Sequence, residues 1–69
     1  MEMKPIDGSS SIKEVGFEDG TLRVVFQRGT AYKYFEVPDE VYLNLLQSES
    51  KGKFLRSDIM SKYKAEKEV

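Results

Sequence analysis

The amino-acid sequence predicts an α+β domain in which a three-stranded antiparallel meander is followed by two helices packed on one sheet face. Three observations support this fold class. Residues 11–37 contain three strand-like runs separated by short turns, apolar residues recur at helical spacing after residue 38, and 69 residues are enough for only one domain. Because so short a chain hides only about 60% of its unfolded surface, we expect most of its large apolar side chains to share one core.

Tight turns and side-chain alternation define the predicted meander. Asp19-Gly20 suits a two-residue hairpin turn because both residues tolerate positive φ, and Arg28-Gly29 makes a second reversal. Between these turns the side chains alternate between the two faces of a strand. One face carries Leu22, Val24 and Phe26. The other carries Arg23, Val25 and Gln27. Two consecutive tight turns indicate antiparallel pairing of neighbouring strands.

The first predicted helix begins near Pro38, which suits the first turn of a helix. Asp39 and Glu40 follow and place negative charge at the positive end of the helix dipole. Apolar residues then recur at helical spacing, at Val41, Tyr42, Leu45 and Leu46. The polar stretch "QSESKG" ends this helix.

The second predicted helix follows Ser50, a residue type that caps helix N-termini. Leu55, Ile59 and Tyr63 are four residues apart and form one apolar stripe, with Phe54 beside it. We therefore expect both helices to cover the same face of the sheet.

The domain is predicted to cover residues 10–64, between a flexible N-terminal arm over residues 1–9 and a frayed C-terminal tail over residues 65–69. The arm has no apolar run and does not resemble a signal peptide, and no stretch is long enough to span a bilayer. The absence of cysteine fits a reducing compartment. We expect a cytoplasmic protein without membrane contacts.

Enzymatic chemistry finds little support in the composition. The chain has no histidine for acid–base work and no cysteine nucleophile, and metal sites of the Cys/His kind are excluded. The isolated Gly52 makes no phosphate-binding loop. We therefore predict no catalytic residue, no metal site and no small-molecule cofactor.

Tyr32 and Tyr34 admit two interpretations. They are two residues apart and share one face of a strand, so they are either a platform on which bases stack or part of the core under the helices. The core interpretation is favoured because a small domain cannot leave so much aromatic area unburied. The opposite sheet face would then expose Lys33 and Phe35, which are secondary contact candidates on what is otherwise a solvated face.

Charge is distributed unevenly along the chain. Residues 1–50 carry five basic and nine acidic side chains, whereas residues 51–64 carry five basic side chains and one acidic one. The candidate nucleic-acid-binding residues come from this basic segment and are Lys51, Lys53, Arg56 and Lys64. On a helix the last three form one stripe together with Met60. The stripe is either an anion-binding surface or the ordinary solvated face of an amphipathic helix.

Several motifs resemble those of the KTSC domain. They are "VGF", "TLRVVFQRG", the central "YKYFEVP", and "SKGKF" followed by Ile59 and Tyr63. The likeness covers about residues 10–63. This family is named for the C-terminus of certain lysyl-tRNA synthetases and also occurs as free-standing short proteins in bacteria and phages. The resemblance implies a small module with no established activity, and it suggests RNA as a partner.

Two functions follow as expectations. The first is a non-enzymatic module that binds RNA or another anionic partner through the basic face of the second helix. The second is a protein-interaction module that docks through exposed apolar residues. Salt separates them, because phosphate-driven binding weakens steeply with ionic strength and apolar docking does not.

Overall fold

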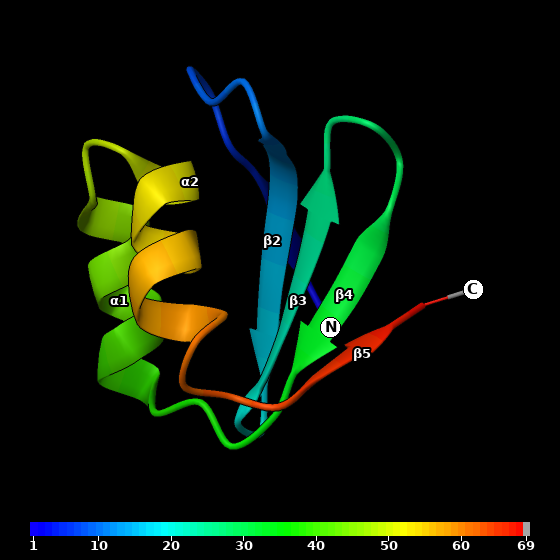
Figure 1. Cartoon of the computed structure of the whole chain (residues 1–69), viewed down its shortest axis with the longest axis vertical. Helices are drawn as coiled ribbons and strands as arrows, with labels where there is room; N and C mark the ends of the chain where they lie inside the picture. Colours follow the sequence, from blue (N-terminus) through cyan, green and yellow to red (C-terminus); the bar gives the residue numbers. More distant parts are fainter. Residues whose placement is uncertain (69) are drawn as a thin grey trace.

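The computed structural model describes residues 1–68 and shows an α+β fold with two helical segments beside an antiparallel sheet (Figure 1). The strands are β1 (Met3–Pro5), β2 (Ile12–Glu18), β3 (Thr21–Phe26), β4 (Ala31–Tyr34) and β5 (Ala65–Lys67). The helices are α1 (Asp39–Gln47) and α2 (Lys51–Phe54), and α2 continues into a π-helical segment, η1 (Leu55–Ile59). No helix within residues 1–68 is both long and apolar enough to cross a membrane.

The sheet has five strands in the order β1-β2-β3-β4-β5, and each neighbouring pair is antiparallel. The predicted meander is therefore present as its three central strands. The segments predicted as a loose arm and a frayed tail include the two edge strands, because residues 3–5 pair with β2 and residues 65–67 pair with β4. The last residue of the predicted tail, Val69, lies outside the described residues.

The turn between β2 and β3 has the predicted backbone conformation. Asp19 and Gly20 both have positive φ, 49° and 78°. The flanking residues Glu18 and Thr21 are cross-strand partners, so the turn has two central residues. A two-residue turn of this kind matches the natural twist of antiparallel strands and therefore fixes the register of the hairpin.

Gly20→Val is expected to lower the free energy of unfolding by about 1–3 kcal/mol, because a β-branched residue is strained at positive φ. The strain would come from the backbone alone, since the nearest atom to an added Cβ is the Val37 carbonyl oxygen at 3.9 Å. Urea unfolding measures the change. Gly20→Asn is the control and should cost less, because asparagine adopts this conformation more readily. Equal stability of the valine variant and wild type would contradict the argument.

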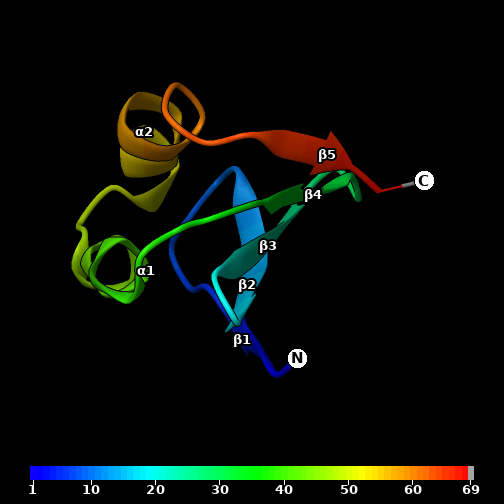
Figure 2. The ribbon, with the colours of Figure 1, turned by 90° about the horizontal axis from the view of Figure 1, so that it is seen from below.

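Both helical segments cover one face of the sheet (Figure 2). The core between the helical segments and the sheet is formed mainly by buried aliphatic side chains. Leu22 is the cross-strand partner of Tyr34, and Val24 that of Tyr32, so both tyrosines lie on the core face. Tyr34 is only 2% exposed, whereas Tyr32 is half-buried and packs against the core. The core interpretation is thus confirmed for Tyr34 and holds in part for Tyr32.

Helix α1 follows the sequence prediction closely. Pro38 precedes the first helical residue in an extended conformation, and Asp39 and Glu40 occupy the first turn. Leu45 is the buried residue of this helix. Around it Val41, Tyr42 and Leu46 pack against the core while remaining partly accessible.

The second helix departs from the predicted geometry. Ser50 precedes α2, but its side chain makes no capping hydrogen bond. After Phe54 the helix widens, and the Met60 amide donates to the Leu55 carbonyl at 2.8 Å, a bond that spans five residues. Leu55 and Ile59 are buried, as predicted. Tyr63 follows the end of the helix and packs against the core while half-buried.

An ion pair on the open face of the sheet ties the C-terminal edge strand to the centre. The Arg23 guanidinium on β3 donates to both carboxylate oxygens of Glu68, at 2.8 and 2.9 Å. Lys33 Nζ lies 3.8 Å from the same carboxylate. The hydrogen bond from Arg23 lowers the pKa of Glu68 and raises that of Arg23 itself. Since Glu68 directly follows β5, this contact helps to hold β5 against β4.

Candidate anion-binding site

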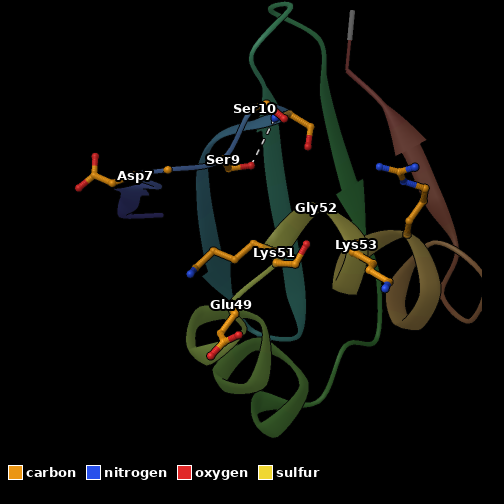
Figure 3. Close-up of a pocket in the computed structure, with 11 residues that line it drawn as sticks. Asp7, Ser9, Ser10, Glu49, Lys51, Gly52 and Lys53 are labelled. Carbon is orange, nitrogen blue, oxygen red and sulfur yellow. Dashed lines mark hydrogen bonds between the residues drawn. The ribbon is translucent and has the colours of Figure 1, made fainter.

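A polar pocket of about 210 Å³ lies between the loop that precedes β2 and the start of α2 (Figure 3). The loop contributes residues 7–11, which include three consecutive serines, and the helical side contributes residues 49–53 and Arg56. These two segments are far apart in sequence. The packing of the helices against the sheet brings them together.

The loop side of the pocket is fixed by a serine turn. Ser9 Oγ accepts hydrogen bonds from the backbone amides of Ser11 at 3.3 Å and Ile12 at 3.0 Å. These bonds order the loop directly before β2 begins. Because Ser9 Oγ accepts from both amides, its own hydroxyl proton is free to be donated elsewhere.

The helical side approaches this loop closely at Gly52. A Cβ atom built on Gly52 would lie 2.5 Å from Ser11 Oγ, which is closer than real Cβ contacts come. Glycine therefore allows the loop and the helix start to meet at their present separation. Any larger residue requires the Ser11 side chain to move.

Three of the four predicted cations line this pocket. Lys53 and Arg56 are exposed and line it, and with Ser57 they also line an adjoining open hollow of about 480 Å³. No ion pair in the described part of the chain involves either residue. Lys51 also lines the pocket, but its ammonium donates to the Ser48 carbonyl at 2.9 Å. Lys53 and Arg56 are therefore better placed than Lys51 to meet an external anion.

Acidic side chains limit where an anion can sit. Asp7 and Glu49 line the pocket as well, and Figure 3 shows Asp7 at the end opposite Lys53. No acidic residue lines the adjoining hollow among the described residues. The electrostatic field therefore favours an anion on the side of Lys53 and Arg56.

The predicted position of Lys64 is wrong. The helix ends at Ile59 and a turn follows, so Lys64 lies in the extended segment that leads into β5. Its carbonyl accepts a hydrogen bond from the Phe35 amide at 3.0 Å. Because β5 pairs with β4, the chain leaves helical geometry before Lys64. Lys64 therefore does not lie on the same helical stripe as Lys53 and Arg56. Met60 is exposed at the end of the helix.

The secondary candidates lie elsewhere. Lys33 is on β4 opposite Arg23, on the sheet face away from the helices, and it is close to Glu68. Phe35 follows the end of β4 and is half-buried, so the strand is shorter than predicted. Neither residue lines the pocket.

The serines of the loop were not predicted as site residues, and their close approach to Gly52 was not expected. The sequence assigns most of this loop to a flexible arm. The only local sequence feature that indicates a site there is the run of three serines directly before Ile12. The close approach of Ser11 to Gly52 depends on how the helix docks on the sheet. That contact joins residues far apart in the sequence, so it cannot be predicted from the spacing of residues.

Comparisons with known proteins give a consistent relationship. The sequence profile of the KTSC domain matches residues 8–63. A protein from Tsukamurella paurometabola is 35% identical over 65 residues, covering 91% of this chain and 96% of that protein. The crystal structure of a KTSC domain protein from Yersinia pestis superposes with a TM-score of 0.88 at 30% identity, covering 99% of this chain and 97% of the other. The chain therefore belongs to the KTSC domain family.

Proposed function

We propose that this protein is a non-enzymatic module that binds RNA, with Lys53 and Arg56 contacting backbone phosphates. The observation that carries the proposal is the placement of these two cations. Both are exposed, both line the pocket and its adjoining hollow, and within residues 1–68 neither has an acidic partner.

The chemistry of the two side chains fits phosphate recognition. Arginine offers a planar fork of donors that matches two phosphate oxygens, and lysine acts as a mobile point charge. The Ser57 hydroxyl lines the same hollow, although it donates to the Lys53 carbonyl at 2.9 Å. Contacts of this kind position a nucleic acid without reading its sequence. Residues 1–50 carry more acidic than basic side chains, so the basic segment that holds Lys53 and Arg56 is a favourable place for phosphate contact.

Reversing both charges with Lys53→Glu and Arg56→Glu is expected to abolish RNA binding and leave the fold intact, because both side chains are exposed. Anisotropy of fluorescein-labelled single-stranded RNA at about 50 and about 200 mM salt measures the effect. The double alanine variant should retain weak binding, with a salt slope smaller by roughly two units.

A matched control reverses two exposed lysines that do not line the pocket, Lys4 and Lys62. Lys4→Glu with Lys62→Glu makes the same change in net charge and should weaken binding far less. If the Lys53/Arg56 reversal binds RNA like wild type while remaining folded, the basic side of α2 is only a solvated surface. A protein partner would then be the better hypothesis.

A further inference from the structure

A second groove, of about 440 Å³, lies between the end of η1 and the strands β3 to β5. Its apolar lining is mostly aromatic and consists of Phe26, Tyr32, Tyr34, Met60 and Ala65. Its polar lining comes from Arg28, Thr30 and Lys67, and no acidic side chain lines it among the described residues. The volume falls in the range of about 300–1,000 Å³ that is typical of ligand pockets.

The aromatic side chains form a connected row in which Tyr32 is central. The rings of Tyr32 and Phe26 meet edge to face, with centroids 5.9 Å apart and planes 81° apart. The Tyr32 and Tyr34 rings are closer to parallel, at 28° and 6.5 Å. Tyr34 is buried and backs the row, whereas Tyr32 is half-buried and open to the groove. Tyr32 is therefore a ring that contacts two other aromatic side chains and is partly accessible from the groove.

Two cations lie at the rim of this row. Lys67 on β5 is the direct cross-strand partner of Tyr32, so its side chain is on the same sheet face. Arg28 lies in the turn between β3 and β4. Both are exposed, and neither takes part in an ion pair within residues 1–68. The groove thus combines an aromatic surface with positive charge.

This combination identifies the chemistry of the occupant. An apolar peptide would fit the aromatic row but would make no favourable charge interaction with Arg28 and Lys67. A simple anion would gain no binding energy from the aromatic row. A nucleotide within a single strand offers both a flat base and a phosphate, and such strands bind to aromatic side chains beside cations. Met60, which lines the groove, directly follows η1, the helical segment that carries Arg56.

We propose that the groove holds an unpaired base of single-stranded RNA, stacked on Tyr32, with the adjoining phosphates at Arg28 and Lys67. This inference rests on the proposed function and extends it, since the same strand would continue to Lys53 and Arg56. In a duplex each base is already stacked and paired and is not available to Tyr32. The groove therefore makes the protein prefer single strands to duplexes.

The test compares Tyr32→Leu with Tyr32→Phe, using fluorescein-labelled oligoadenylate alone and annealed to oligouridylate. Tyr32→Phe keeps the ring and should bind single strands like wild type. Tyr32→Leu should weaken single-strand binding by roughly 5- to 150-fold, the range expected for losing one stacked base. Binding of the duplex should not change, so the preference for single strands should fall with it.

The outcomes separate this inference from the proposed function. If the Lys53/Arg56 reversal abolishes binding while Tyr32→Leu leaves single-strand affinity unchanged, the groove proposal is wrong and the phosphate-binding surface stands. If the wild-type protein binds neither probe, both are wrong. If Tyr32→Leu does not fold, Arg28→Ala combined with Lys67→Ala decides instead, because it alters only exposed side chains. Unchanged single-strand affinity in that variant overturns the groove proposal.

Discussion

Tyr34→Ala is expected to lower the free energy of unfolding by about 3–5 kcal/mol, the cost of removing a large aromatic ring from a packed core. Tyr34 is 2% exposed, pairs with Leu22 across the sheet and belongs to the buried core cluster. A domain of 69 residues has a total stability of roughly 3–10 kcal/mol. The variant should therefore lose a large part of its stability, and at the low end of this range it should be unfolded at room temperature.

Tyr34→Phe is the matched control because it keeps the ring and removes only the hydroxyl group. Burial raises the pKa of Tyr34, so this hydroxyl stays neutral at physiological pH. The phenylalanine variant should remain folded. Circular dichroism during urea unfolding distinguishes the two variants, and a cooperative transition for Tyr34→Ala at the wild-type midpoint would show that the ring does not support the core.

Leu45→Ala is expected to cost about 2–5 kcal/mol, because it leaves a cavity where α1 packs on the sheet. Leu45 has no exposed surface and is the buried residue of this helix. Leu43 lies on the same helix but is 53% exposed, so Leu43→Ala should change stability by no more than about 0.5 kcal/mol. Thermal unfolding of both variants makes the comparison. Equal losses would mean that α1 is held by something other than its buried face.

The centre of the fold could be predicted because its signals are local. The alternation of the Leu22, Val24 and Phe26 face with the Arg23, Val25 and Gln27 face marks the core side of β3, and Asp19-Gly20 sets the turn before it. Each of these features depends on residues within a few positions of one another. They lead directly to the placement of Tyr34 in the core.

The two edge strands could not be predicted in the same way. Each is three residues long, and β5 is exposed at every position, so neither shows an alternation of buried and exposed residues. They are strands because their backbones pair with β2 and β4. That pairing depends on where the rest of the chain places these segments. It therefore cannot be predicted from the sequence of the short segments themselves.

The candidate site was predicted only in part, because some of its residues are placed by local helical spacing and others by contacts between distant segments. Lys53 and Arg56 are three residues apart on a real helix, so their placement on one side follows from helical spacing. Lys64 was misplaced because the residues after Ile59 give no local signal that the helix stops. The serine loop and Lys67 reach their sites only through contacts between distant parts of the chain.

The wide helical turn at Leu55–Ile59 affects which deletions in the sequence the fold can accept. In an α-helix each residue rotates the chain by about 100°, so losing one residue turns every later side chain away from its partners. A π-helical turn contains one residue more than an α-helical turn. Deleting a residue such as Ser57 would therefore convert this turn to ordinary helix while Leu55 and Ile59 still face the core. The helix therefore contains a point at which one residue can be lost without rebuilding the interior.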